Sequence, residues 1–443
     1  MRILKRTLLA LILFAILMIS SSAVYIYYQQ DELEQVVIKE INKRLKSPIK
    51  IGDIEFSVIK NLPFASIELN NILAIDAFQK DTLCEIELLQ LKFNILDLYN
   101  NNFIIQELTL KNGFASIYYK DSMPNYEIWH STQDGSQEEN TDFGLENISL
   151  ENLKVAYAID DIQSVIVNNK TQLQLSINNG RTEINLEGYI TNEKLILDGI
   201  NHLPSKKLNL NGDIVIDTTG VKIKSAIDLS DIQMDLDLES IDKAMTVKVN
   251  IFEFELEPTL KLIPKYYLSA LEGYELQGKS TIKFNYINDQ QKEAFINVDF
   301  DLKEGYIKGK DFPFDMNEIS LKGSYSNGKQ RTDASTEIKL NNIQFTTNGE
   351  LVQANAVIQG LENPTLITDF NTQMQLSEIE RWGYKHDFKS LLGDAQIKGT
   401  YKGKIGLKNK FTYDLAMAEK TADLTINNLS LHSDEQSPQL SNA

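Results

Sequence analysis

The stretch Met234–Leu256, MDLDLESIDKAMTVKVNIFEFEL, decides the fold class of this chain. Apolar residues alternate with acidic ones from Met234 to Glu239, and they alternate with polar ones from Met245 to Asn250. A period of two is typical of a β-strand that buries one face and leaves the other in water. The stretch therefore predicts two strands, each with one apolar and one polar face.

The apolar positions change parity within this stretch. Val247, Val249 and Ile251 carry odd numbers, whereas Phe252 and Phe254 carry even ones. A shift by one residue would turn the second set to the opposite face of the sheet. We therefore predict a one-residue β-bulge near Ile251, because a bulge returns both sets to one apolar face.

The same alternation recurs along most of the chain after Pro48, for example in Leu153–Ile159, Ile296–Leu302 and Leu424–Ile426. At usual strand lengths the chain has room for roughly twenty strands. Asn-Gly pairs are typical of tight hairpin turns. Three such pairs predict turns at Asn211-Gly212, Asn327-Gly328 and Asn348-Gly349.

Helical patterns are few beside this number of strands. Apolar residues at helical spacing predict helices over Asp31–Leu45 and Thr259–Leu271, and a shorter one over Ser377–Trp382. The apolar strand faces therefore need another cover. Two sheets packed together, a closed barrel, or a sheet curled into an apolar groove would each provide it. The N-terminal segment disfavours an outer-membrane barrel, and the sandwich remains the alternative to the groove.

The first thirty residues predict a membrane anchor. Arg2, Lys5 and Arg6 precede an uncharged run, and its apolar part, Thr7–Tyr28, would be about 33 Å long as a helix. Basic residues before the run and acidic residues after it place the N-terminus in the cytoplasm and the bulk of the chain outside it. The anchor residues are Leu8, Leu11, Phe14, Leu17, Ile19, Val24, Tyr25 and Tyr28.

A cleaved signal peptide is the alternative for this segment. Leu8–Ile19 has the length of an apolar signal core, and Ser20–Ala23 offers small residues for cleavage. The apolar run continues past these small residues to Tyr28, which favours the anchor. Either interpretation exports the rest of the chain.

Composition excludes several classes of protein. The 443 residues include 62 Asp+Glu and 44 Lys+Arg, which gives a formal net charge of −18. A nucleic-acid-binding surface needs a basic stripe, so we expect no nucleic acid partner. The single cysteine, Cys84, cannot form an internal disulfide, and four widely spaced histidines do not suggest a metal centre. We expect no metal and no cofactor.

The sequence contains no convincing catalytic set. Gly273–Ser280 (GYELQGKS) has the spacing of a P-loop, but a strand pattern follows it, whereas a P-loop needs a helix there. We therefore expect no nucleotide binding. Asp160-Asp161 and the pair Asp235/Asp237 lie in alternating runs, so a solvated face explains them. Cys84 lies among apolar residues and is interpreted as a small buried hydrophobe. We expect that the chain is not an enzyme.

Three stretches resemble one known family. Ser47–Asp76 (SPIKIGDIEFSVIKNLPFASIELNNILAID) after an anchor and a helix resembles the opening of AsmA-family proteins. Gly305–Lys329 (GYIKGKDFPFDMNEISLKGSYSNGK) resembles the recurring unit of that family, and Leu391–Gly406 (LLGDAQIKGTYKGKIG) resembles its Gly-spaced C-terminal strands. The resemblance covers essentially the whole chain at the level of pattern. The AsmA family is related to the TamB and YhdP proteins of the cell envelope, so the chain resembles this wider group as well.

The resemblance implies a fold and a division of the chain. The expected fold is mainly β: a transmembrane helix, then an elongated, curled antiparallel sheet with an apolar groove and few short helices. The expected parts are 1–30 (tip and anchor), 31–132 (helix, then strands), 133–145 (polar loop) and 146–443 (groove region). Family members are considerably longer, so we expect a chain that is truncated at its C-terminal end.

The resemblance also implies a function. It predicts an inner-membrane-anchored periplasmic protein that binds or conducts phospholipid for outer-membrane lipid homeostasis. The alternative is a non-enzymatic assembly factor that binds outer-membrane proteins by strand addition. Alternation alone would make the strand residues ordinary core, whereas the scarcity of helices and the resemblance together favour a lipid-lining role. The predicted lining residues are Val247, Val249, Ile282, Phe284, Ile296, Val298, Phe300, Ile338, Leu340, Leu424 and Ile426.

Overall fold

A computed structural model of the chain describes most of its residues after the N-terminal segment. The described residues are 42, 45–47, 49–57, 64–94, 105–128, 145–159, 161–178, 180–203, 205–290, 293–309, 314–378, 390–406, 412–414, 416–432 and 440–441. The chain divides into two compact units, Met1–Val215 and Ile216–Ala443. The units are described separately below.

Strands make up most of the described residues of the first unit, and their backbone N–H and C=O groups pair with those of neighbouring strands. Its strands are β1 (Asp53–Ser57), β2 (Phe64–Ile75), β3 (Thr82–Asn94), β4 (Ile105–Lys120), β5 (Met123–Pro124), β6 (Leu145–Ile159), β7 (Ile162–Asn178), β8 (Arg181–Leu197), β9 (Ile200–Asn201) and β10 (Lys206–Ile216).

The main sheet of the first unit has the order β1-β2-β3-β4-β6-β7-β8-β10. Its neighbours with a given register are antiparallel except β4 and β6, which run parallel with Ile105 beside Leu145. The expected fully antiparallel sheet is therefore wrong at this pair. Parallel neighbours need a long connection, and residues 121–144 supply it, with β5 returning onto the end of β4.

The second unit is a meander, in which successive long strands pair with each other. Its strands are β11 (Gly220–Leu229), β12 (Ile232–Ile241), β13 (Ala244–Glu255), β14 (Tyr274–Asn288), β15 (Phe295–Gly309), β16 (Met316–Ser326), β17 (Glu337–Thr347), β18 (Glu350–Gln359), β19 (Thr365–Gln375), β20 (Ser390–Gly406), β21 (Thr412–Tyr413), β22 (Glu419–His432) and β23 (Leu440–Ser441).

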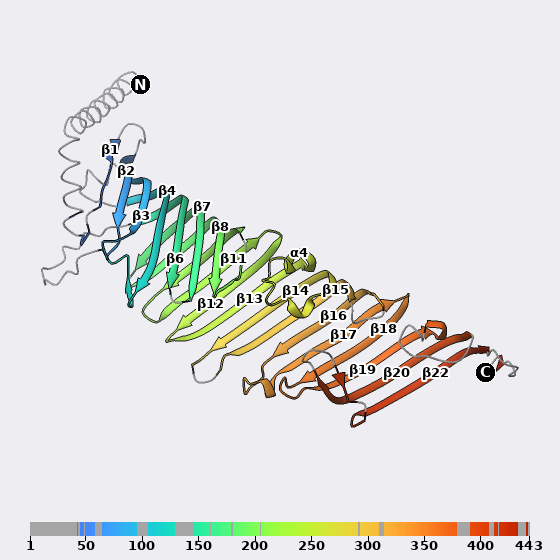
Figure 1. The fold of residues 1–443 in the computed structure, drawn as a ribbon. Helices are drawn as coiled ribbons and strands as arrows, with labels where there is room; N and C mark the ends of the chain where they lie inside the picture. Colours follow the sequence, from blue (N-terminus) through green and yellow to red (C-terminus); the bar gives the residue numbers. More distant parts are fainter. Residues whose placement is uncertain are drawn as a thin grey trace, which may run out of the picture. The chain divides into compact units, whose positions relative to one another are not determined.

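Every ladder of the second unit is antiparallel, and in Figure 1 its described strands form a single layer. The short β21 pairs with the end of β20, and β23 pairs with the end of β22. A mainly β fold with almost no helix is therefore confirmed for the described residues.

The three predicted Asn-Gly turns have different outcomes. Asn348 and Gly349 both have positive φ, 50° and 84°, and join β17 to β18 in a two-residue hairpin, as predicted. Asn327-Gly328 opens a longer connection that ends at Thr336. The prediction at Asn211-Gly212 is wrong, because the pair lies inside β10. There the even-numbered positions are apolar on both sides of Gly212, at Leu208, Leu210, Ile214 and Ile216, which is the pattern of one strand.

The predicted helix over Thr259–Leu271 is also wrong in its extent. The structure has a single helical turn, α4 (Leu256–Leu260), followed by turns and the 3-10 helix η1 (Ser269–Leu271). Pro264 lies in the middle of the predicted helix, where it can donate no backbone hydrogen bond and disfavours a helical residue before it. A second 3-10 helix, η2 (Asp333–Ser335), begins with a capping box formed by Thr332 and Ser335.

Several predictions fall on residues outside the described ranges. They are the anchor over Thr7–Tyr28, nearly all of the helix over Asp31–Leu45, the polar loop around Gln133–Thr141 and most of Ser377–Trp382. Within the described part of the chain, no helix has the length and apolar character needed to cross a membrane.

Some of the buried apolar residues form small local clusters, and the others are scattered along the strands. In the first unit Ile54, Leu69 and Ile72 form one cluster, between β1 and β2. In the second unit Met374, Leu376 and Ala395 form another, where β19 meets β20. Most strand residues in these sheets remain partly accessible.

Candidate functional site

The predicted lining residues form rows across the strands of the second unit. Residues directly opposite each other in an antiparallel ladder share a face of the sheet. Val249 lies opposite Phe284, and Phe284 lies opposite Val298. Val298 in turn lies opposite Tyr325, which lies opposite Ile338. One row therefore joins five strands, from β13 to β17.

A second row runs beside the first. Ile282 lies opposite Phe300, Phe300 lies opposite Gly323, and Gly323 lies opposite Leu340. Tyr286 connects two more predicted residues to this side, because it pairs with Val247 on β13 and with Ile296 on β15.

The last two predicted residues lie on β22. Leu424 is opposite Ile397, and Ile426 is opposite Ala395. The cross-strand pairs Phe345–Val352, Val352–Thr372 and Thr372–Ile397 continue the same side of the sheet from β17 to β20. The registers thus place all eleven predicted residues on one side of the sheet, which we call the apolar face. Whether they line a lipid site stays a prediction.

The bulge predicted near Ile251 is present. Ile251 pairs with Ile282, but the next register pair joins Phe254 to Ser280, so β13 has one residue more than β14 between them. Phe254 consequently lies on the apolar face, where its side chain is 6% exposed, whereas Phe252 is 48% exposed. The change of parity in the sequence is explained by this bulge.

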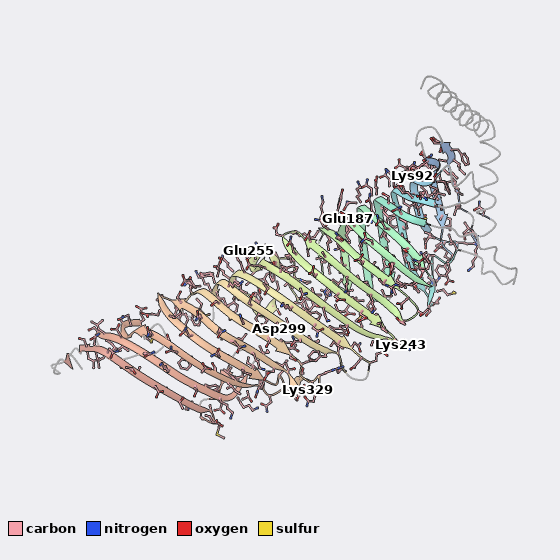
Figure 2. All side chains as sticks on the ribbon, turned by 180° about the vertical axis from the view of Figure 1, so that it is seen from behind. Lys92, Glu187, Lys243, Glu255, Asp299 and Lys329 are labelled. Carbon is pink, nitrogen blue, oxygen red and sulfur yellow. The ribbon has the colours of Figure 1, made fainter. Side chains whose placement is uncertain are left out.

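The opposite side of the sheet, the charged face, carries ions of both signs. Lys224 lies opposite Asp237, Lys283 opposite Asp299, and Lys398 opposite Asp423, so cross-strand pairs join opposite charges. Figure 2 shows the side chains along these strands, with Asp299 labelled. By contrast, the paired positions of β12 to β17 that face the apolar side carry no charged residue.

The apolar face is only partly shielded from solvent. None of the eleven predicted residues is fully buried: ten are half-buried, and Leu424 is 58% exposed. The inner side of a close-packed sandwich would bury such residues completely. Among the described residues of this unit, no second sheet or long helix lies over this face (Figure 1). Ile397 and Ile426 are exceptions in part, because they pack against the Met374 cluster.

Aromatic rings lie over glycines at three places on the apolar face. A Cβ atom added to Gly323 would lie 2.1 Å from the Phe300 ring, and one added to Gly399 would lie 2.6 Å from the Phe370 ring. Gly309 has the same relation to the ring of Tyr274, its cross-strand partner. These rings therefore lie against the backbone of the next strand, so their side chains project less from the sheet at these points.

A line of bulges crosses three neighbouring strands, β15 to β17, and Gly278 of β14 lies opposite the first of them. Gly278, Glu304, Glu318 and Asn342, on β14 to β17, all have positive φ, and the registers shift beside each of them. The strands approach closely here, since a Cβ on Gly278 would lie 2.9 Å from the Cα of Gly305. Bulges bend strands and increase their twist. The parity changes in the sequence, from Leu302 to Ile307 and from Leu340 to Ile343, are the signals that predict them.

The P-loop spacing at Gly273–Ser280 has no P-loop structure around it. The motif runs into β14 without a following helix, and the Lys279 ammonium lies 2.9 Å from the Glu304 carboxylate. Among the described residues no group of His, Cys, Asp or Glu could hold a metal ion. Cys84 is half-buried against Leu45 and Ala74, and this burial raises the pKa of its thiol.

The first unit contains a buried polar network that sequence patterns did not predict. The side chains of Asp76 and Asn125 are fully buried. The Tyr118 hydroxyl donates to the Asp76 carboxylate at 2.5 Å, and the Tyr118 backbone N–H donates to Asn125 Oδ1 at 3.0 Å. Asn125 Nδ2 donates to the Ser116 carbonyl at 2.8 Å. The network ties the end of β2 to the end of β4 and the turn after it.

Protonation equilibria follow from these bonds. Burial acts to raise the pKa of Asp76, but hydrogen bonds from the Tyr118 hydroxyl and from the backbone amides of Lys80, Asp81 and Phe78 bring it below its ordinary value. The same bond to Asp76 raises the pKa of Tyr118 to about 12. Asp76 is therefore held as a carboxylate, which suits a structural role at the end of the sheet.

The apolar face is thus the main candidate site of the described residues. It joins rows of aliphatic and aromatic side chains that remain partly open to solvent, and its reverse side is charged. Its paired positions carry aliphatic and aromatic side chains, with glycine and hydroxyl-bearing residues between them. Comparison with protein-family models, with characterised proteins and with solved structures found no match to this chain.

Proposed function

We propose that this chain is a membrane-anchored envelope protein of the AsmA type that holds the acyl chains of phospholipids on its apolar face. The observation that carries the proposal is the apolar face itself, a set of eleven aligned residues of which none is fully buried. Exposed apolar surface of this extent is costly in water unless a ligand or partner covers it. Lipid chains are ligands of matching chemistry.

The energetics require no catalysis. Moving an acyl chain from a bilayer to the apolar face exchanges one apolar environment for another. Each methylene that stays out of water preserves about 0.8 kcal/mol. The headgroup would remain at a wet edge, where the sheet offers polar side chains. The line of bulges from Glu304 to Asn342 supports a sheet that bends into a groove, since bulges bend strands.

The remaining parts of the proposal come from the sequence. Arg2, Lys5, Arg6 and the apolar run to Tyr28 support an inner-membrane anchor with a cytoplasmic N-terminus and a periplasmic body. The resemblance to AsmA proteins supports a role in supplying phospholipid to an outer membrane in a Gram-negative-type envelope.

Lipid analysis tests the proposal directly. The full chain is purified from membranes, and the lipid that remains bound is extracted and quantified by mass spectrometry. We expect glycerophospholipid in stoichiometric or higher amounts relative to protein. A preparation that is folded and free of bound lipid, and that takes none from added vesicles, contradicts the proposal.

A second candidate function rests on the edge of β22. This strand pairs with β20 over Glu419–His432, whereas among the described residues its other side meets only β23, at Ser430 and Leu431. Leu424, in the middle of this edge strand, is 58% exposed. Such an edge can accept a further strand, which supports an assembly factor for outer-membrane proteins.

The two functions make different predictions for the β22 edge. Leu424→Lys places a charge on the edge strand, which opposes strand addition. If the assembly function is correct, this variant loses binding to an unfolded outer-membrane barrel protein in fluorescence anisotropy. If lipid binding is the function, the variant retains most of its lipid, because Leu424 lies on the edge strand, is 58% exposed and is outside the central rows of the apolar face.

A further inference from the structure

The ladder between β13 and β14 is incomplete. Its last register pair is Glu255 with Lys279, but β14 begins five residues earlier, at Tyr274, where it pairs with Gly309 of β15. The chain leaves β13 as α4 and returns through η1 immediately before β14. The first part of β14 therefore has the α4–η1 connection where the other strands have a strand neighbour.

A cavity of about 890 Å³ lies between this connection and the first residues of β14. Apolar side chains of the connection line it, namely Leu260, Ile263, Leu268 and Leu271. A volume of roughly 300–1,000 Å³ with mainly apolar walls and a few polar groups is usual for small-molecule sites. The cavity therefore has the size and chemistry of a ligand site.

The cavity touches both sides of the sheet. Leu276 lines the cavity and lies on the apolar face, the same face of β14 as Ser280 and Ile282. Glu275 and Gln277 also line it and alternate with Leu276, so they belong to the charged face. Along the paired stretches of the ladders on either side of β15, hydrogen-bonded strands separate the two faces. At this break, one cavity connects an apolar wall to charged groups.

The charges around the cavity have both signs. Lys261 and Lys265 line it together with Glu257, Glu272 and Glu275. The Lys261 ammonium is already 3.0 Å from the Glu257 carboxylate, which leaves one lysine and two glutamates to meet a ligand. This set is complementary to a headgroup that carries a phosphate and an ammonium, and its excess of negative charge opposes an anionic lipid.

Two exposed tyrosines lie in the same connection. The side chains of Tyr266 and Tyr267 are 70% and 52% exposed, and their ring centroids lie 5.2 Å apart at nearly right angles. Amphipathic rings of this kind are enriched where proteins meet the headgroup region of a bilayer. They suit contact between the connection and a lipid surface.

We propose that the cavity between the α4–η1 connection and β14 is a lateral entry port for a zwitterionic glycerophospholipid. The acyl chains pass along Ile263, Leu268 and Leu276 onto the apolar face. The phosphate lies near Lys265, and the ammonium lies near Glu272 and Glu275. The proposal rests on the proposed function of the apolar face, and it adds where a lipid enters and which headgroup is accepted.

The test measures how fast the purified full chain takes up lipid. Phosphatidylcholine vesicles carry pyrene-labelled phosphatidylethanolamine at a density high enough for excimers to form, and loss of excimer fluorescence reports transfer to the protein. Ile263→Trp narrows the cavity at a residue that is already 38% exposed. We expect uptake to slow at least tenfold while the final amount of bound lipid changes little. Met417→Trp is the matched control, because Met417 is 87% exposed and lies outside the cavity.

A second variant tests the headgroup. Lys265 is exposed, so Lys265→Glu is expected to fold normally even if Ile263→Trp does not. It should slow uptake of labelled phosphatidylethanolamine several-fold. In the wild type, labelled phosphatidylglycerol should be taken up more slowly than phosphatidylethanolamine. Equal rates for the two lipids, or no effect of Lys265→Glu, overturn the assignment of the headgroup.

The outcomes separate this inference from the proposed function. A wild-type protein that binds no lipid at all overturns both. A wild-type protein that loads lipid, together with an Ile263→Trp variant that folds and loads at the same rate, overturns the port alone. Slow uptake in Ile263→Trp with normal uptake in Met417→Trp supports the port.

Discussion

Val298 has the environment that best distinguishes a lipid surface from a dry core. It lies in the middle of β15, between Phe284 and Tyr325 on the neighbouring strands, and it is half-buried. An apolar side chain in this position contacts its cross-strand neighbours and retains access to the space above the sheet. The two interpretations of the apolar face therefore predict different effects of a charge here.

Val298→Asp should abolish lipid binding and leave most of the stability. A carboxylate in the acyl path repels the ligand, whereas water above the open face keeps the cost below the several kcal/mol of a charge buried without a partner. Bound lipid and the urea unfolding midpoint are measured on the same sample. The matched control is Val357→Asp, on the charged face opposite Lys339, which should retain lipid. A collapsed midpoint, or unchanged lipid, counts against the proposed function.

Asp76 should make the stability of the first unit depend on pH in acid. Its pKa is lowered in the folded chain, so its contribution is complete above its unfolded pKa of about 3.9 and is lost as the pH falls through the lower, folded value. Urea midpoints between pH 7 and pH 2 measure this loss. Asp76→Asn should be less stable at neutral pH and should show a flatter decline in acid.

The Tyr118 hydroxyl offers an independent check. Tyr118→Phe removes the donor at 2.5 Å from the Asp76 carboxylate, so the pKa of Asp76 should rise toward its ordinary value. The loss of stability in acid should then be smaller than in the wild type and should end at a higher pH, because its onset is set by the unfolded pKa, which both proteins share. Identical acid declines for the two proteins would show that this hydrogen bond does not set the pKa.

Sequence patterns predicted single residues well where the signal was local. The period of two assigned Val249, Phe284 and Val298 to one face, because alternation within a strand fixes its two sides. The bond between Asp76 and Tyr118 joins residues that are 42 positions apart. No local periodicity encodes such a partner, so this network could not be predicted from the sequence.

Bulges are the elements that set the shape of the strands in the second unit. Gly278 on β14 has φ +132°, and the Cβ of an alanine there would lie 2.9 Å from the Cα of Gly305. The position therefore combines a conformation that L-residues avoid with contact from a neighbouring backbone.

Gly278→Ala should destabilise the second unit by about 1–3 kcal/mol, because strain and steric contact add. The control Gly360→Ala also has a positive φ, +74°, but its nearest contact is 3.6 Å away, so it should cost less. Chemical denaturation of both variants measures the difference. Equal losses would mean that the close approach at Gly278 contributes nothing.

The P-loop spacing at Gly273–Ser280 belongs to a strand, and its lysine should be dispensable. Lys279→Ala removes an ion pair with Glu304, and exposed pairs of this kind stabilise little. We expect an unchanged fold, unchanged lipid loading and no nucleotide effect, measured by thermal unfolding, by lipid extraction and by titration with ATP. ATP binding by the wild type that this variant loses would contradict our interpretation.

Helices were the least predictable elements. Leu260, Ile263, Tyr267 and Leu271 have helical spacing, yet Pro264 interrupts them and the chain forms turns there. Those same apolar side chains, except Tyr267, line the cavity beside β14. The spacing of these residues therefore arose because their side chains line the same cavity, and periodicity alone does not distinguish this arrangement from a helix.

The whole chain should keep its N-terminal segment when it is in the cell. The uninterrupted apolar run through Tyr28 supports an anchor that remains uncleaved. N-terminal sequencing of the membrane-extracted protein checks this, and we expect the first residues to be those before the apolar run. A mature protein that starts at Ala23 or Val24 would contradict the anchor and support a cleaved signal peptide.

The fold class could be predicted because the sequence contains many strand patterns with one apolar face and few helical patterns. The parallel pairing of β4 with β6 did not follow from these patterns, because alternation within a strand does not encode the direction of the neighbouring strand. The division between Val215 and Ile216 was equally hidden, since the period of two continues through β10.

The meander of the second unit has a consequence for how it can fold. Each strand from β12 to β20 pairs with the strand just before it, so the contacts are local and their loop-closure cost is small. A chain that leaves a translocation pore in the order of its sequence would deliver these strands one after another. Each hairpin could then add to an existing template, and the growing edge would expose one unfinished strand at a time to aggregation.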